Sequence, residues 1–352
     1  MSELTATLPG LETVESVQPA PQRGHWIQRG PEGKLMLFSG RSNVDLAERI
    51  ADKLGIELGD VHLKTFANGE VYCRYLESIR GADVFIVQSC AGPPTNEHLV
   101  ELLVMIDAAR LASANRITAV MPWYPYSRQD KKSAPREPIT AKLVATFLEA
   151  AGVDRVLTMD LHAGQIQGFF TIPVDHMTAL PLFANYYRTD KRLHGDGVVV
   201  VAPDPGRAKM AARFAEMLDA DFALMRKVRP DHDVATVTEV SGRVAGKVAI
   251  MSDDIVVTGG TLVAGAQALR EAGAADVYAC ATHGLFPDGA LDKLLGRGLS
   301  EIVITDSVHQ DVLHQPDELK VLSASGLLAD TIQNVFSGES VSAIFAGENQ
   351  LF

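Results

Sequence analysis

Short apolar runs alternate with amphipathic segments along most of this chain of 352 residues. The runs at 117–121 and 198–202 contain few polar side chains, which is typical of strands buried on both faces of a parallel sheet. Residues 45–54 carry leucine or isoleucine at every fourth position and predict an amphipathic helix. This alternation predicts an α/β protein with mostly parallel sheets flanked by helices, repeated in two halves.

The two ends of the chain differ from its middle. Residues 1–32 contain four prolines, scattered acids and no sustained period, so they predict a flexible extension, with order beginning at Lys34. Near the other end, residues 327–335 predict a helix and residues 338–345 a short strand.

Composition narrows the class of protein. Hydrophobic content of 47% and charged content of 22% are ordinary for a globular protein, and the formal charge of −12 argues against a nucleic-acid partner. Three cysteines without a CxxC pair (Cys73, Cys90 and Cys280) suggest reduced thiols. Neither an apolar run of 18 residues nor a signal-peptide pattern is visible, so we expect a cytoplasmic protein without a membrane partner.

The clearest chemistry lies in KVAIMSDDIVVTGGT, residues 247–261. An apolar strand at 248–251 should end at two carboxylates, Asp253 and Asp254, and a Gly/Thr loop then opens a helix at 262–271. Backbone N–H groups at such a loop can cradle a phosphate, while carboxylates suit sugar hydroxyls or Mg²⁺. The alternative is a plain strand-to-helix turn with two solvated aspartates.

A basic loop follows the strand at 117–121. It places four cations within nine residues, just past a strand end, where ligands bind in α/β sheets. Arginine forks and lysine ammoniums there suit a polyphosphate, although a solvated charge run is the alternative. The four cations are Arg128, Lys131, Lys132 and Arg136.

Three further segments have both a structural and a functional interpretation. FANGE (66–70) contains Asn68-Gly69, a tight-turn signal, and predicts either a simple hairpin or an aromatic surface for a nucleobase. Beyond the strand at 155–159, period two would place Asp160 and His162 on one side of the chain. Asp204 directly follows the strand at 198–202 and is a candidate metal contact.

A second basic cluster follows a predicted strand at 222–225. Arg226, Lys227 and Arg229 come directly after that strand, and the polar stretch beyond them could form a mobile flap. An exposed basic turn is the alternative.

These segments, taken in order, resemble the motif series of ribose-phosphate pyrophosphokinases (PRPP synthetases). The TGGT loop alone also resembles that of type I phosphoribosyltransferases, which consume PRPP. The longer series is specific to the synthetases and spans residues 34 to about 345. Its motifs here are FANGE, ESIRG, NEHLVELLVMIDAAR, YSRQDKK, REPITAKL, MDLHAGQIQGFF, RKVRP, DDIVVTGGT, YACATH, ITDS and GESVS.

The resemblance implies two duplicated type I phosphoribosyltransferase-like domains with the active site between them. We expect an ATP-side domain at 33–177 joined by 338–352, and a ribose 5-phosphate-side domain at 178–337. The implied reaction is Mg²⁺-dependent transfer of the β,γ-diphosphoryl group of ATP to D-ribose 5-phosphate, giving PRPP and AMP. A homo-oligomer, commonly a dimer-based hexamer, is also implied.

The resemblance also implies roles for individual residues. His162 and Asp204 would hold Mg²⁺ or its nucleotide complex, and Lys227 and Arg229 would be the catalytic flap cations. ATP would be bound by Phe66, Asn68, Gly69, Glu70, Arg128, Gln129 and His162. Ribose 5-phosphate would be bound by Arg229, Asp253, Asp254, Val257, Thr258, Gly259, Gly260 and Thr261.

The sugar-phosphate loop departs from the common synthetase pattern at two positions. Val257 stands where an aspartate is usual, and Gly259 where alanine or cysteine is usual. Two other functions therefore stay open at this point. One is a non-catalytic relative that regulates an active subunit, and the other is a phosphoribosyltransferase that consumes PRPP.

Overall fold

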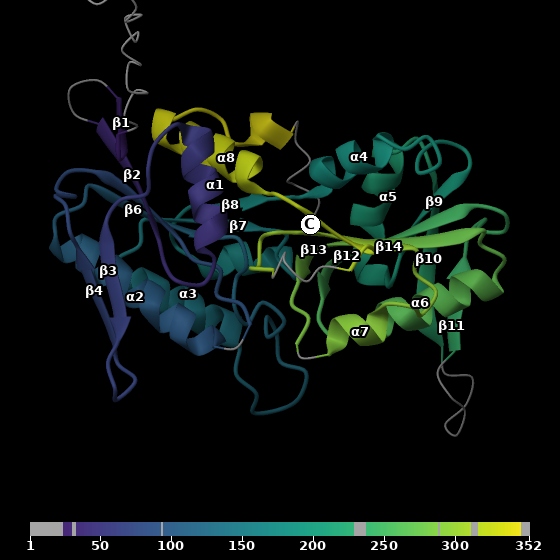
Figure 1. Ribbon diagram of the computed structural model, residues 1–352. Coiled ribbons are helices and arrows are strands. Elements are labelled where there is room, and N and C mark those ends of the chain that lie inside the picture. The colour runs from purple at the N-terminus through teal and green to yellow at the C-terminus, as the bar shows by residue number, and fades with distance from the viewer. Residues whose placement is uncertain are drawn as a thin grey trace, which may run out of the picture.

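The computed structural model describes residues 24–29, 33–92, 94–228, 237–287, 289–310 and 316–345. Two separate sheets form its two halves, one with strand order β1-β2-β5-β6-β7-β8 and the other with order β11-β10-β9-β12-β13-β14-β15 (Figure 1). All neighbouring strands of both sheets are parallel except the edge pairs β1–β2 and β10–β11. The predicted α/β class with mostly parallel sheets is confirmed.

The first sheet lies between α1 and the pair α2 and α3, with a separate hairpin, β3–β4, at its side (Figure 1). Its strands are β1 (Trp26–Arg29), β2 (Gly33–Ser39), β5 (Asp83–Val87), β6 (Arg116–Met121), β7 (Arg155–Met159) and β8 (Val174–Met177). The hairpin is β3 (Val61–Thr65) and β4 (Val71–Tyr75), and the helices are α1 (Val44–Leu54), α2 (Thr95–Leu111) and α3 (Thr140–Ala151), followed by the 3₁₀ helix η1 (Gly164–Phe169).

The second sheet has α4 and α5 on one face and α6 and α7 on the other (Figure 1). Its strands are β9 (Val198–Ala202), β10 (Asp221–Val228), β11 (Val237–Ser241), β12 (Val248–Val256), β13 (Asp276–Gly284), β14 (Glu301–Thr305) and β15 (Leu319–Leu322). The helices of this part of the chain are α4 (Leu180–Arg188), η2 (Pro205–Arg207), α5 (Ala208–Met217), α6 (Gly260–Glu271), α7 (Ala290–Leu294), α8 (Ser325–Ser337) and η4 (Ser342–Phe345).

The two halves share a core and are joined by hydrogen bonds near their sheet ends. One hydrophobic cluster contains residues of both sheets, and α8 packs on α1 of the first half. Asp306 lies just after β14. Its carboxylate accepts a hydrogen bond from Arg49 Nη1 at 3.0 Å, and its backbone carbonyl oxygen accepts one from Asn43 Nδ2 at 2.8 Å. These contacts hold the carboxyl ends of the two sheets against each other, which is where the predicted ligand residues lie.

Two predictions for the chain ends are wrong within the described residues. Order begins before Lys34, because β1 pairs antiparallel with β2 from Trp26 onward. The segment predicted as a strand at 338–345 ends in η4 instead, since Val341 and Ile344, three residues apart, both pack on the core. The remainder of the predicted extension, 1–23 and 30–32, and the terminal residues 346–352 lie outside the described residues.

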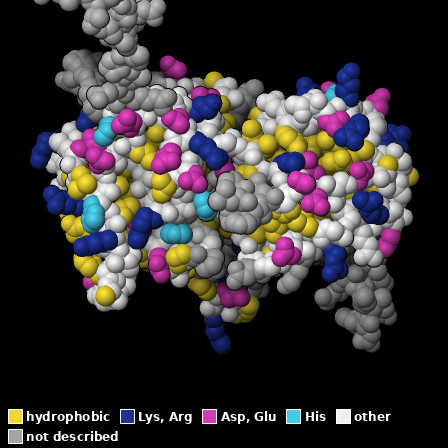
Figure 2. Space-filling model, viewed as in Figure 1, with side chains coloured by type: hydrophobic (Ala, Val, Ile, Leu, Met, Phe, Trp, Pro, Cys, Tyr) yellow, Lys and Arg dark blue, Asp and Glu magenta, His cyan; other side chains and the backbone are white. Residues whose placement is uncertain are grey.

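The surface carries charges of both signs. Figure 2 shows Lys and Arg side chains interspersed with Asp and Glu over the face in view. Among the described residues, none of the helices combines the length and apolar character that a membrane span requires.

Candidate active site between the two halves

The acidic pair lies inside β12 and not at its end. The parallel pairing of β12 with β13 continues past Asp253 to Val256, so the predicted strand end at 251 is wrong. Neighbouring β13 extends as far as Gly284 and supplies the hydrogen-bonding partner for these extra residues. The carboxylates therefore project from a rigid element, and the loop begins only after them.

The Gly/Thr loop between β12 and α6 has the geometry of an anion cradle. Gly259 caps α6 with a left-handed φ of +74°, and a Cβ there would lie 2.0 Å from Cδ1 of Leu294. With Leu294 of this chain packed against the loop, only glycine meets both conditions without strain. The residues at the start of α6, where helix N–H groups lack intrahelical partners, line a cavity of about 190 Å³.

That cavity brings most of the predicted sugar-phosphate and metal residues together. Arg128 and His162 reach it from the first half, and the other lining residues come from the second half. The predicted residues around it are Arg128, His162, Asp204, Asp253, Asp254, Val257, Thr258, Gly259, Gly260 and Thr261.

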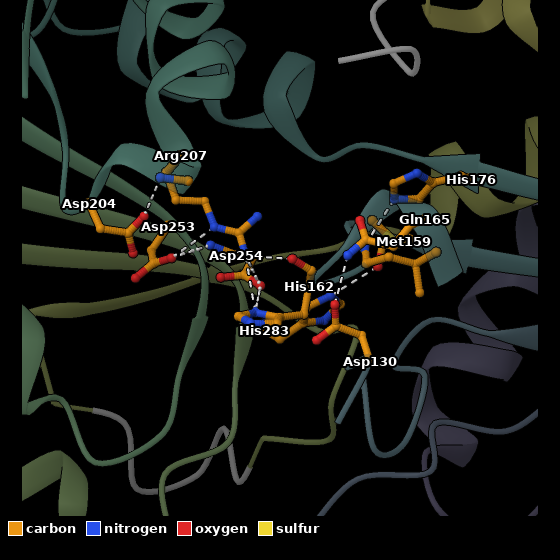
Figure 3. Close-up of polar contacts among 12 residues, drawn as sticks. Asp130, Met159, His162, Gln165, His176, Asp204, Arg207, Asp253, Asp254 and His283 are labelled. Carbon is orange, nitrogen blue, oxygen red and sulfur yellow. Dashed lines mark hydrogen bonds and ion pairs between the residues drawn. The ribbon is translucent and has the colours of Figure 1, made fainter. Parts of the chain in front are cut away.

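Arg207 is the residue of this site that the sequence reasoning missed. Figure 3 shows its guanidinium between the two aspartates on one side and His162 on the other (Figure 3). Its Nη2 lies 2.5 Å from Oδ2 of Asp254 and 3.0 Å from the carbonyl oxygen of His162, and its Nε lies 3.6 Å from Oδ1 of Asp253. The sequence offered one signal, an arginine three residues after Asp204, which itself follows the strand at 198–202.

The two aspartates occupy different electrostatic environments. Burial acts to raise the pKa of Asp254, but the hydrogen bond from His162 and the charge of Arg207 outweigh it and lower the pKa to about 2. Burial and the neighbouring Asp254 carboxylate together raise the pKa of Asp253 to about 8. Asp254 is thus the ionised member of the pair, and Asp253 is the more exposed member, with 14% of its side chain accessible against 2% for Asp254.

His162 projects from the first half toward the acidic pair of the second. Its Nδ1 lies 2.8 Å from Oδ2 of Asp254, and about a third of the side chain remains exposed. Asp160, predicted to share its side of the chain, is instead buried and receives Ala179 N–H and Thr282 Oγ1 on its carboxylate. The period-two prediction fails because β7 ends at Met159 and Asp160 has a φ of +32°.

Asp204 could contribute to a metal site. Its Oδ1 accepts the Gly206 N–H at 2.7 Å, which orients the carboxylate beside the cavity. No group of three or more His, Cys, Asp or Glu side chains among the described residues could enclose a metal by itself. Mg²⁺ commonly binds through one or two carboxylates together with substrate phosphates and water, so this donor set fits a metal delivered with a polyphosphate.

Two more cavities adjoin the first. One of about 520 Å³ has Arg128 and Gln129 beside the apolar side chains of Trp123, Leu285 and Pro287. The other, of about 490 Å³, is lined by Lys131 and Lys209 together with His162, Asp204 and Arg207. Arg128 and Lys131 of the predicted basic loop line these cavities, whereas Lys132 and Arg136 are exposed and line none of the three.

The predicted nucleobase surface lies apart from these cavities. Residues 66–70 form the turn of the β3–β4 hairpin, with Phe66 N–H donating to the Glu70 carbonyl at 2.8 Å. Phe66 is exposed, and none of the three cavities described above is lined by Phe66, Asn68, Gly69 or Glu70. In Figure 1 the hairpin projects from the side of the first half that faces away from α6.

The flap cations are described only in part. The strand predicted at 222–225 continues as β10 through Val228, so Arg226 and Lys227 lie within it. Pairing with β11 extends it, since Lys227 lies opposite Thr238. Arg229 lies outside the described residues.

Comparisons with known proteins agree with this geometry. The family profile described as the N-terminal domain of ribose phosphate pyrophosphokinase matches residues 35–152, and that of the phosphoribosyl synthetase-associated domain matches residues 231–346. The ribose-phosphate pyrophosphokinase of Fusobacterium nucleatum is 49% identical over 311 residues, covering 88% of this chain and 98% of the relative. That of Caldanaerobacter subterraneus is 49% identical over 312 residues, with the same coverage.

A solved structure gives the same answer for the fold. The crystal structure of phosphoribosylpyrophosphate synthetase from Mycobacterium smegmatis is similar to this chain with a TM-score of 0.81 at 43% identity. The similarity covers 86% of this chain and 99% of that one. The fold, the loop after β12 and these matches lead to one conclusion: the chain belongs to the ribose-phosphate pyrophosphokinase family.

Proposed function

We propose that this protein is a ribose-phosphate diphosphokinase that makes PRPP for nucleotide biosynthesis. It transfers the β,γ-diphosphoryl group of Mg-ATP to the C1 hydroxyl of D-ribose 5-phosphate and releases AMP. The observation that carries the proposal is a pair of adjoining cavities. One combines the anion cradle with carboxylates, and the other is lined by Lys131 and Lys209. His162 and Asp204 line both.

The reaction is a displacement at phosphorus. The C1 oxygen forms a bond to Pβ, the bond from Pβ to the oxygen bridging it to Pα breaks, and the hydroxyl proton is released. The protein has little covalent chemistry to perform, so the rate depends on alignment and on charge stabilisation. Two cavities that share His162 as a lining residue suit the approach of a sugar to a polyphosphate.

The sugar phosphate would lie in the loop after β12. Backbone N–H groups from Val257 to Thr261 and the positive end of the α6 dipole would hold the 5-phosphate. Val257 can contribute only its main chain, so the aspartate usual at this position in relatives is not required for the cradle. The sugar hydroxyls would then lie over β12, beside Asp253 and Asp254.

The nucleotide would bind beside the basic loop. Arg128 and Gln129 would contact ATP, and the apolar walls of their cavity suit an aromatic base. Because Phe66 does not line that cavity within one chain, we propose that the β3–β4 hairpin, with Asn68, Gly69 and Glu70, reaches the nucleotide of a second copy. This requires a homo-oligomer, and we propose the dimer-based hexamer.

Mg²⁺ would enter with the nucleotide, held by the Asp204 carboxylate and the phosphates, with His162 alongside. When bound, the ion neutralises charge on the polyphosphate. Lys227 and Arg229, near the end of β10, would supply the remaining positive charge at the transferring group. The three cysteines, which are free in the structure, would stay reduced in the cytoplasm, where we place the protein.

The test is production of AMP and PRPP by the purified protein from Mg-ATP and ribose 5-phosphate. Lys227→Ala should lower the rate by about 10²–10³-fold, the cost of removing one preorganised charge. Activity that appears only after an active subunit is added would show a regulatory relative. Consumption of PRPP that depends on a free base would show a phosphoribosyltransferase.

A further inference from the structure

Arg207 is the only buried arginine or lysine among the residues that the structure describes. A buried cation is tolerated only where opposite charge and hydrogen-bond acceptors surround it. Arg207 meets that condition with Asp254 Oδ2 at 2.5 Å and the His162 carbonyl oxygen at 3.0 Å. Its partners therefore come from both halves of the molecule.

The same contacts fix the hydrogen positions on the His162 ring. Nδ1 lies 2.8 Å from the Asp254 carboxylate and 3.1 Å from Arg207 Nη2. A guanidinium only donates and an ionised carboxylate only accepts, so the Nδ1 hydrogen points to Asp254. In the neutral ring Nε2 keeps its lone pair, and Asp254 sets the ring orientation, in the manner of histidines that bind through one nitrogen and are oriented through the other.

This arrangement gives the two aspartates of the acidic pair different surroundings. Oδ2 of Asp254 is occupied by both His162 and Arg207, and the side chain is 2% exposed. Asp253 is more accessible, and its nearest cation is Arg207 Nε at the longer distance of 3.6 Å. Asp253 is consequently the member of the pair that is available to a ligand in the cavity.

We propose that Arg207 and Asp254 are positioning residues that hold His162 across the boundary between the halves, and that Asp253 alone of the acidic pair contacts the sugar. The proposal rests on the proposed function for its substrate. It differs from the expectation that both aspartates take ribose hydroxyls. His162 follows β7, Arg207 follows β9 and Asp254 lies in β12, so the three meet only when the halves are docked.

Steady-state kinetics on a matched pair, Asp253→Asn and Asp254→Asn, provides the first test. Asp254→Asn and Arg207→Met should each lower kcat by about 10²-fold, which is the effect expected when a catalytic side chain is displaced by about an ångström. In both variants KM for ribose 5-phosphate should change less than about threefold. Asp253→Asn should raise that KM by about tenfold, as expected for one lost polar contact. Arg213→Met, a half-buried α5 residue paired with Glu216 and absent from the three cavities, is the control and should match the wild type.

A readout independent of turnover follows the imidazole itself. In ¹H–¹⁵N spectra of ¹⁵N-histidine-labelled protein, with His162→Gln used for assignment, wild-type His162 should show the Nδ1–H form. Arg207→Met and Asp254→Asn should show a mixture of tautomers. Thermal unfolding reports whether each variant is folded, and Arg207→Lys, which retains the charge, serves if Arg207→Met does not fold.

Several outcomes would overturn the proposal. An equal rise in KM for ribose 5-phosphate in both aspartate variants would mean that both contact the sugar. An unchanged kcat and an unchanged His162 spectrum in folded Arg207→Met or Arg207→Lys would remove the positioning role. Inactive wild-type protein would contradict the proposed function instead, and the tautomer measurement would still decide whether Arg207 and Asp254 orient His162.

Discussion

Nδ1 of His162 lies 2.8 Å from Oδ2 of Asp254, although 92 positions separate the two residues in the chain. This single hydrogen bond joins the first half of the molecule to the strand that carries the sugar-phosphate loop. It means that the candidate site is a property of how the halves dock, and that mutations at their boundary should affect catalysis as well as stability.

Gly259→Ala should impair both folding and sugar-phosphate binding. An alanine there adopts an unfavourable φ of +74° and meets Leu294 Cδ1 at 2.0 Å, so we expect a stability loss of about 2–4 kcal/mol from strain and overpacking together. KM for ribose 5-phosphate should rise at least about tenfold because the cradle shifts. Denaturant unfolding and steady-state kinetics provide the measurements.

Gly55→Ala is the matched control for that variant. Gly55 has the same φ of +74°, ends α1, and has no atom within 4 Å of the added Cβ. It should cost only about 1 kcal/mol and leave KM unchanged. Equal effects of the two variants would show that the Leu294 contact does not shape the loop.

Asp130 should affect the binding of ATP because it holds the basic loop in position. Its buried carboxylate accepts Gln165 Nε2 at 2.7 Å and so ties the segment bearing Arg128 and Gln129 to the segment after His162. Asp130→Ala should raise KM for ATP about tenfold, the effect of losing one such hydrogen bond, with little change for ribose 5-phosphate. Purely additive effects of Asp130→Ala and Gln165→Ala in a double-mutant cycle would exclude this coupling.

Mixed oligomers should reveal whether the β3–β4 hairpin serves a neighbouring copy. Phe66→Ala and Lys227→Ala chains, each of low activity alone, should regain measurable activity when they are co-assembled. Some sites would then combine an intact hairpin from one chain with an intact Lys227 from the other. Activity no greater than the sum of the two separate variants, in verified mixed oligomers, would contradict a contribution across subunits.

His176 should make the fold sensitive to mild acid. Its Nε2 accepts the Leu161 N–H at 2.8 Å, and burial lowers the pKa of His176 to about 4. Between that value and the unfolded pKa of about 6.5, the unfolded chain binds the proton and the folded one does not, so stability falls as the pH falls through this window. About 2 kcal/mol should be lost between pH 7 and pH 5.

Denaturant unfolding at pH 7 and pH 5 gives the measurement for this prediction. His176→Gln, which can still accept a hydrogen bond, should show a correspondingly smaller loss of stability over the same range. His283, whose pKa is also lowered by burial, remains in both proteins and contributes to the pH dependence of each. An identical pH dependence of the two proteins would mean that His176 does not titrate in this way.

Local pattern was enough to predict the class of fold and the position of the main loop. Buried strands such as β9 and the helix α1 follow from apolar runs and from four-residue periodicity, because these signals depend only on nearby residues. The Gly/Thr step after β12 could be located for the same reason, since a helix start and a glycine in the left-handed region are local events.

Strand ends and terminal segments were less predictable. β10 and β12 continue beyond their apolar runs because β11 and β13 supply pairing partners, and such partners are not visible in a single segment. The same dependence on a neighbour explains β1, which becomes a strand by pairing with β2.

The sequence by itself determined the two α/β halves, the family and most of the residues around the sugar-phosphate cavity. Only the tertiary structure decided that Arg207 lies buried between Asp254 and His162, that Asp253 is the more accessible aspartate, and that Phe66 lines none of the three cavities of the candidate site. The physical reason is that burial and charge pairing depend on distances between distant segments, which become fixed only when the two halves pack together.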